Sequence, residues 1–142
     1  MDPSDYAGPL AVTLAYIGLY YAFVIWVGVV KARRAKAWRE RGEKFDRYYS
    51  EDREMLAADR LQLNTLEQMP PFLVLLWLEA VFGSTTLATI AGSVYVAARA
   101  LYPVVMGSRM GRGVKASILA STVPGYLVIF FFLGHLAWLV IS

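Results

Sequence analysis

The chain has 142 residues, of which 58% are hydrophobic, and its mean hydropathy is +0.47. A soluble core of this size could not bury so much apolar surface, so the surplus must face lipid or another subunit. The chain has no cysteine, which excludes disulfides, iron–sulfur ligation and a protein thiol nucleophile, and its net charge is +3.

The first long apolar segment runs from about residue 10 to residue 30 and contains no charged residue. A helix of about 20 residues crosses a hydrocarbon core of roughly 30 Å. This segment is therefore predicted to be the first of several membrane-spanning helices.

Three further apolar segments follow it, each with few charges. The segment 61–82 carries Glu67 and Glu79, the segment 84–106 carries only Arg99, and the segment 118–141 carries only His135. The sequence therefore predicts an all-α membrane protein, a bundle of four transmembrane helices in a single domain that spans residues 1–142. Prolines inside the last three segments predict kinks near packed helix interfaces.

The positions of the cations predict the orientation in the membrane. Ten of the 14 Lys and Arg residues lie in residues 31–60, and three more lie in residues 107–117, so both connections are expected in the cytoplasm with the two termini outside. The segment 31–60 also holds seven acidic residues, and the basicity is explained better by topology and anionic lipid than by nucleic acid. The spans on either side of it are expected to extend into it as helices.

Polar residues recur at helical spacing in the second and third spans. Arg60, Asn64 and Glu67 share one face of the second helix, and Arg99 and Tyr102 share one face of the third. Glu67 and Arg99 each lie about 10 Å from the cytoplasmic end of their span, so the two faces are expected to meet and the two charges to pair. Such a pair can serve a site, or it can only fix helix packing. The single histidine and the absence of cysteine predict no metal site.

The second-span motif, Arg60 to Asn64 to Glu67 followed by Pro and Phe-Leu, closely resembles the signature of the MAPEG superfamily, the membrane-associated proteins in eicosanoid and glutathione metabolism. The similarity continues through Ala32-Arg33-Arg34 after the first span and through residues 94–102 in the third span. It covers nearly the whole chain.

The resemblance implies a homotrimer with a glutathione site at each subunit boundary, near the cytoplasmic face. It implies membrane lipid and a hydrophobic small molecule as further partners. Glutathione has two carboxylates and one ammonium, so its site needs several arginines and at least one acid. The predicted glutathione-binding residues are Arg33, Arg60, Asn64, Glu67, Gln68, Arg99 and Tyr102.

Family transferases hold the glutathione sulfur as a thiolate beside an arginine, and Arg112 is the candidate for this catalytic role, with Arg109 second. The family's basic position falls on Gly113, and two family tyrosines are replaced by Gln68 and Met106. These departures argue against a dedicated leukotriene synthase.

The predicted function is a glutathione S-transferase or peroxidase that acts on hydrophobic electrophiles or lipid hydroperoxides, in a bacterial cytoplasmic membrane. The alternatives are a non-catalytic lipid-binding or scaffold protein of the same fold, and a purely structural bundle.

Overall fold

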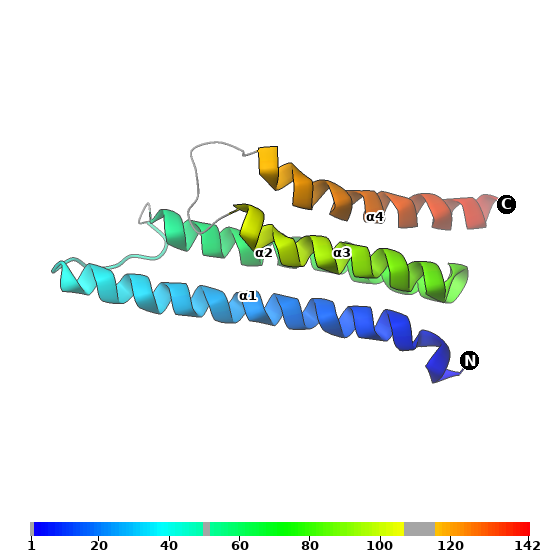
Figure 1. The fold of residues 1–142 in the computed structure, drawn as a ribbon, viewed down its shortest axis with the longest axis horizontal. Helices are drawn as coiled ribbons and strands as arrows, with labels where there is room; N and C mark the ends of the chain where they lie inside the picture. The colour runs from blue at the N-terminus through cyan, green and yellow to red at the C-terminus, as the bar shows by residue number, and fades with distance from the viewer. Residues whose placement is uncertain (1, 50–51, 107–115) are drawn as a thin grey trace.

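The fold is a bundle of four long helices that lie side by side (Figure 1). The computed structural model describes residues 2–49, 52–106 and 116–142, and within them it contains no β-strand. The four helices are α1 (Ala7–Glu40), α2 (Arg53–Leu78), α3 (Thr85–Met106) and α4 (Ala116–Ile141). Each is long and apolar enough to cross a membrane, which confirms the prediction of four spans.

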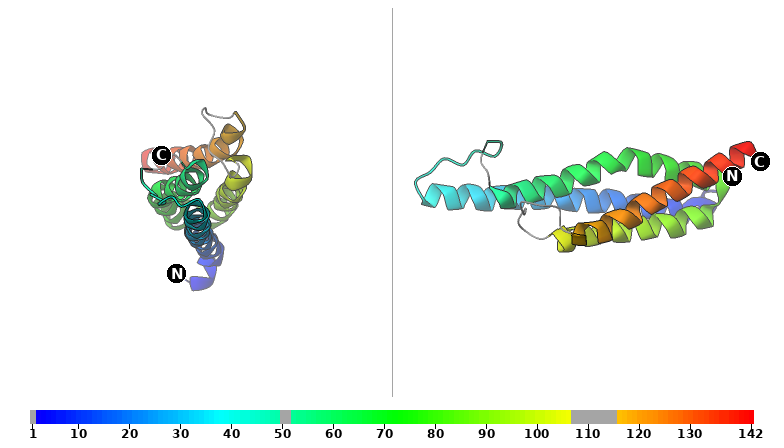
Figure 2. Two further views of the ribbon diagram at one scale, coloured as in Figure 1. Left: turned by 90° about the vertical axis from the view of Figure 1, so that its left-hand side faces the viewer. Right: turned by 90° about the horizontal axis from the view of Figure 1, so that it is seen from above.

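The helices α1 and α4 lie on opposite sides of the α2–α3 hairpin (Figure 2). The amino and carboxyl ends of the described chain lie together at one end of the bundle, and the connection from α1 to α2 lies at the other (Figure 1). We call the end that carries the connection from α1 to α2 the basic end. At about 1.5 Å per residue, α1 is much longer than a hydrocarbon core of roughly 30 Å, so it protrudes there, as the sequence predicted.

Side-chain caps mark the residues at which α2 and α3 begin. At the start of α2, the Asp52 carboxylate accepts hydrogen bonds from the backbone N–H groups of Glu54 and Met55. The other end of α2 widens into a π-helical turn, Glu79–Gly83, which the sequence did not predict. Ser84 then caps α3 by accepting a hydrogen bond from the N–H of Leu87. The prolines at which kinks were predicted lie inside continuous helices. Of these helices, α2 changes direction along its length (Figure 2).

An aromatic cluster forms the centre of the bundle. The rings of Phe72 and Tyr95 stack with centroids 3.9 Å apart, and Tyr16 packs edge-on against both. The Tyr16 hydroxyl donates to the carbonyl of Thr65 at 2.7 Å, so this polar tip is satisfied inside the core. The outer surface carries exposed Ile25 and many other large apolar side chains, which is the arrangement that a lipid solvent favours.

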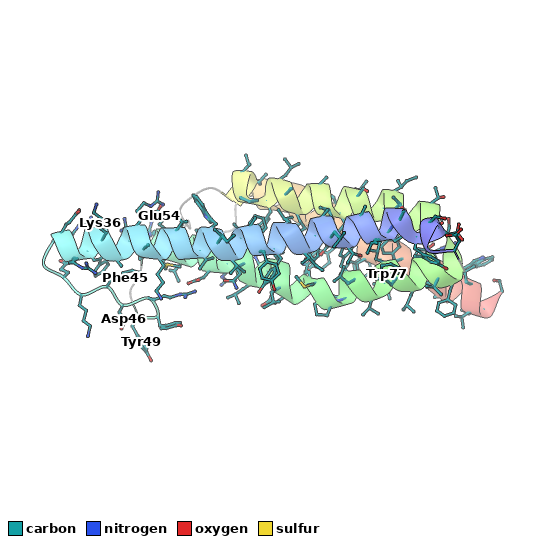
Figure 3. The ribbon with its side chains drawn as sticks, turned by 90° about the horizontal axis from the view of Figure 1, so that it is seen from below. Lys36, Phe45, Asp46, Tyr49, Glu54 and Trp77 are labelled. Carbon is teal, nitrogen blue, oxygen red and sulfur yellow. The ribbon has the colours of Figure 1, made fainter. Side chains whose placement is uncertain are left out.

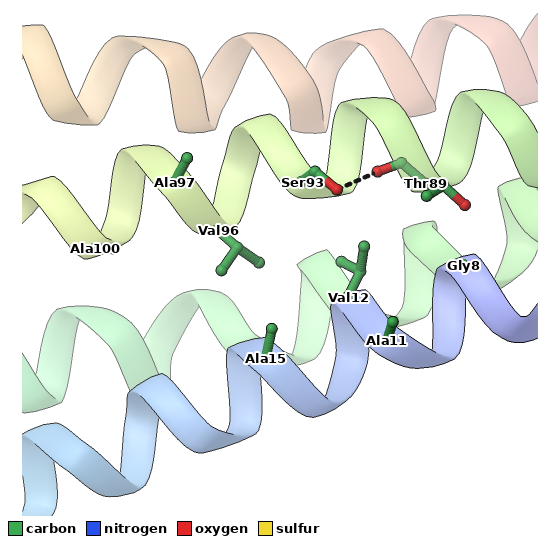
Figure 4. Close-up of a pocket in the computed structure, with 9 residues that line it drawn as sticks. All are labelled: Gly8, Ala11, Val12, Ala15, Thr89, Ser93, Val96, Ala97 and Ala100. Carbon is green, nitrogen blue, oxygen red and sulfur yellow. Dashed lines mark hydrogen bonds between the residues drawn. The ribbon is translucent and has the colours of Figure 1, made fainter.

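Small residues bring α1 and α3 close together. A Cβ added to Gly92 would lie 2.8 Å from side-chain atoms of Val12 and Leu76, and one added to Gly8 would collide with Thr89. Along this contact lies an apolar groove of about 430 Å³, lined mainly by Gly, Ala, Ser, Thr and Val (Figure 4). The close approach provides van der Waals packing, which membrane helices need in place of the hydrophobic effect.

A buried carboxylate joins α4 to the hairpin at the end of the bundle where the termini lie. Glu79 has no exposed surface, and His135 Nδ1 lies 2.9 and 3.0 Å from its two oxygens. The Ser84 N–H also donates to Glu79, at 3.3 Å. A Cβ on Gly83 would lie 2.5 Å from the same carboxylate, so this position has no space for a side chain unless Glu79 moves.

Candidate functional site

The polar faces of α2 and α3 meet through two hydrogen bonds. Asn64 donates from Nδ2 to the Tyr102 hydroxyl at 2.8 Å, and the Tyr95 hydroxyl donates to Gln68 Oε1 at 2.9 Å. The amide assignments follow from this network. The predicted contact between the two faces is confirmed for Asn64 and Tyr102, and Gln68, another predicted binding residue, lies one turn from Asn64.

Arg99 lies between the two tyrosines and is almost completely buried, with 2% of its surface exposed. Its guanidinium carbon lies 5.5 Å from the ring centroid of Tyr95 and 5.9 Å from that of Tyr102, which is within cation–π range. A Cβ on Gly125 of α4 would lie 3.9 Å from Nε, at ordinary van der Waals distance, so α4 packs beside the guanidinium. Among the described residues, Nε and Nη2 of Arg99 have no hydrogen-bond partner.

The predicted ion pair between Glu67 and Arg99 was wrong for the described part of a single chain. Glu67 is exposed, as is Arg60, and neither forms an ion pair there. Successive helical residues are separated by about 100°, so Asn64 and Gln68 are about 40° apart and both face α3. Glu67 lies about 60° from Asn64 on the side away from Gln68, and it therefore points past α3.

Arg33 belongs to a different part of the molecule from the other predicted binding residues. It lies on the protruding end of α1 and pairs with Glu54 of α2. Its neighbour Arg34 donates to Asp52 at 2.7 Å, and the indole N–H of Trp38 donates to the same carboxylate at 3.2 Å. These contacts tie the ends of α1 and α2 together.

The Asp52 carboxylate is held in its charged form by these neighbours. Burial alone would raise the pKa of Asp52, but hydrogen bonds from Arg34, the N–H of Met55 and Trp38 together hold that pKa below its ordinary value. A carboxyl group with a lowered folded-state pKa adds stability above its unfolded pKa of about 3.9 and loses it as the pH falls through the lower folded value. The junction of α1 and α2 is therefore intact at neutral pH.

Arg112 and Arg109, the candidates for thiolate activation, lie outside the described residues. No group of three or more potential metal ligands occurs in residues 2–49, 52–106 and 116–142.

Tyr95 and Gly125 were not predicted to be site residues. The four-residue spacing of Tyr95 and Arg99 places both on one face of α3, but the sequence favoured a packing role for the tyrosine over a place in the site.

The bond between Asn64 and Tyr102 yields a first prediction. Changing Tyr102→Phe should lower the free energy of unfolding by about 1 kcal/mol, because the partly buried amide of Asn64 loses its partner. Melting in detergent measures the change. The control Tyr21→Phe alters a tyrosine that is 59% exposed and should have no measurable effect. Equal melting temperatures for both variants would contradict the assigned bond.

The fold and this arrangement define a multi-pass membrane protein with a polar site between two of its four apolar helices. The chain belongs to the MAPEG family, since a sequence model of that family matches residues 9–142. The chain is also similar to an uncharacterized protein of Synechocystis sp., with 33% identity over 104 residues that cover 72% of this chain and 69% of the relative. The family is thereby established, and the specific activity is a matter for proposal.

Proposed function

We propose that the protein is a membrane-bound glutathione S-transferase or peroxidase that acts on hydrophobic electrophiles or lipid hydroperoxides. The observation that carries the proposal is the buried guanidinium of Arg99, which has two nitrogens without a partner among the described residues and lies where the polar faces of α2 and α3 meet. A buried cation is stable only with a charged or hydrogen-bonding partner. A carboxylate of glutathione would supply such a partner.

The exposed acid and cation on α2 support the assembly that this site needs. Glu67 and Arg60 lie on the outer flank of one chain, and Glu67 is in the part of α2 that crosses the bilayer. A lone charge facing lipid costs on the order of 3 kcal/mol on insertion scales. In a homotrimer, a neighbouring chain would cover this flank, and both side chains would border a glutathione site between subunits.

The orientation of the site follows from the distribution of charge. The basic end of the bundle would face the cytoplasm, and both chain termini would lie outside, in a bacterial cytoplasmic membrane. Glutathione would then reach Arg60 and Glu67 from the aqueous side, and the second substrate would arrive through the lipid. Arg33 at the basic end would contribute to a site only if it exchanged Glu54 for a ligand carboxylate.

The thiol chemistry requires a cation that stabilises the thiolate of glutathione. We assign this role to Arg112, because an adjacent guanidinium lowers the pKa of a thiol and raises its thiolate fraction at neutral pH. The thiolate would attack an electrophilic carbon, form a thioether and expel the leaving group, such as a halide ion. With a hydroperoxide, it would attack the terminal oxygen, release the alcohol and become a sulfenic acid, which a second glutathione would convert to the disulfide and water.

The direct test of the activity is turnover in reconstituted membranes. Purified protein in proteoliposomes should conjugate glutathione to a hydrophobic aryl halide, or reduce a lipid hydroperoxide, above the rate of empty liposomes. Absence of both activities in folded, trimeric protein would contradict the proposal.

A non-catalytic lipid-binding protein of the same fold is the second candidate. The apolar groove between α1 and α3 favours it, as do Gln68 and Met106 in place of family tyrosines. Lipid that stays bound through purification, with no thiolate absorbance when glutathione is added, would favour this candidate over the enzyme.

A further inference from the structure

A second polar depression lies at the basic end, apart from the α2–α3 site. Its volume is about 580 Å³, and its lining includes three cations, Lys31, Arg39 and Lys44, together with Glu43 and Phe45. All of these residues lie between the end of the apolar part of α1 and the loop that follows that helix. The proposed transferase reaction involves none of these lining residues.

The local sequence explains how the depression forms. Lys31 and Arg39 are eight residues apart and share one face of α1, and between them the small side chain of Ala35 leaves space. The helix ends in a Schellman motif, in which Gly42 donates to Arg39 O and Glu43 donates to Trp38 O, each at 3.0 Å. The φ of +76° at Gly42 suits this reversal, because glycine has no Cβ.

The reversal brings the loop back along α1. The ring of Phe45 packs edge-on against Trp38 with centroids 5.9 Å apart, which fixes the loop against the helix and places the neighbouring Lys44 at the rim of the depression. In Figure 3, the loop that carries Phe45 passes below α1, whereas Lys36 is drawn above it. The depression therefore lies on one flank of α1 only.

Lys31 and Arg39 lie on the two sides of the headgroup layer of a membrane. Lys31 follows directly on the uncharged apolar segment of α1, and Arg39 lies about 12 Å further along the helix axis. The headgroup layer extends roughly 5–8 Å beyond each side of the hydrocarbon core. The flexible side chains of Lys31 and Arg39 can therefore reach a phosphate from below and from above.

The charge balance of the lining selects an anion. Three cations and one acid leave a formal excess of two positive charges around the depression. Among these cations, Arg39 offers a planar fork of donors that suits phosphate oxygens, while Lys31 and Lys44 act as point charges. Phe45 supplies an apolar wall beside the cations.

We propose that this depression binds the phosphate of one anionic phospholipid molecule per chain, in the leaflet at the basic end. The lipid would hold the protruding end of α1 and the following loop at the membrane surface.

The test compares two double variants that remove the same charge. Arg39→Gln with Lys44→Gln changes the depression, and Lys36→Gln with Arg41→Gln changes exposed cations of the same segment that are not among its lining residues. Native mass spectrometry of full-length protein, extracted from vesicles of phosphatidylglycerol and phosphatidylcholine, measures the lipid retained. The first variant should lose preference for phosphatidylglycerol by about tenfold more than the second.

Three outcomes would overturn the proposal. An equal loss in the two variants would mean that the preference comes from diffuse surface charge. Retention of both lipids in proportion to their abundance by the unchanged protein would mean that no selective site exists. Displacement of the lipid by millimolar inorganic phosphate or glycerophosphate would mean that the depression takes a free phosphate instead of a lipid. Melting temperatures of the variants in detergent show whether both remain folded.

Discussion

Changing His135→Ala should lower the free energy of unfolding by about 2 kcal/mol, because it removes the main partner of a buried carboxyl group. The reason is the carboxylate of Glu79, which has no exposed surface and has His135 Nδ1 within 2.9 and 3.0 Å of its oxygens. Removing the imidazole leaves the buried carboxyl of Glu79 with only the Ser84 N–H, at 3.3 Å, as a partner among the described residues, and such a poorly satisfied buried group costs about 1–3 kcal/mol. Unfolding in a denaturing detergent series measures it.

Two further variants separate this cause from lost packing. Leu139→Ala removes a more exposed apolar side chain of α4 one turn away and should cost much less. Adding Glu79→Gln to His135→Ala should recover part of the stability, because a neutral amide costs less to bury than a charge. A His135→Ala variant as stable as the unchanged protein would contradict the assigned pair.

Changing Arg60→Ala should lower kcat/KM for glutathione conjugation by tenfold to a hundredfold. A hydrogen bond to a charged group contributes about 1.5–3 kcal/mol, and each 1.4 kcal/mol changes a rate or binding constant about tenfold. Because Arg60 is assigned to glutathione binding, most of the change should be in KM. Arg112→Ala should instead lower kcat, because it is assigned to the thiolate. Steady-state kinetics in proteoliposomes separates the two effects.

The control for both arginines is Arg41→Ala, which removes an exposed cation beyond the end of α1. It should leave turnover unchanged. Unaltered kinetics in both Arg60→Ala and Arg112→Ala would show that neither residue serves glutathione chemistry, and the lipid-binding alternative would then be preferred.

The sequence predicted the architecture well because span length and charge are local properties. The four apolar segments were sufficient to place four helices. The charged residues of the segment 31–60 were sufficient to extend α1 and α2 beyond the hydrocarbon core. The π-helical turn at Glu79–Gly83 was not predictable in this way. Its first residue, Glu79, contacts a histidine 56 positions later in the chain, and local patterns do not reveal such a contact.

The site was predicted only in part, for a geometric reason. Residues three or four positions apart in a helix share a face, and this rule correctly placed Asn64 and Tyr102 on faces that meet. The same spacing could not fix the rotation of α2 about its axis, and that rotation turns Glu67 away from Arg99 and toward the outside of the single chain. Glu67 therefore has no ion-pair partner within the described part of one chain, and the proposed subunit boundary would provide one.

The most direct test of the proposed glutathione site is the melting temperature of the folded protein in detergent, measured with increasing glutathione. A ligand that binds only the folded state stabilises it by about 2.7 kcal/mol at a hundred times its dissociation constant. Glutathione at millimolar concentration should therefore raise the melting temperature of the unchanged protein, and Arg60→Ala should weaken the rise. No shift in the unchanged protein would contradict the existence of the site.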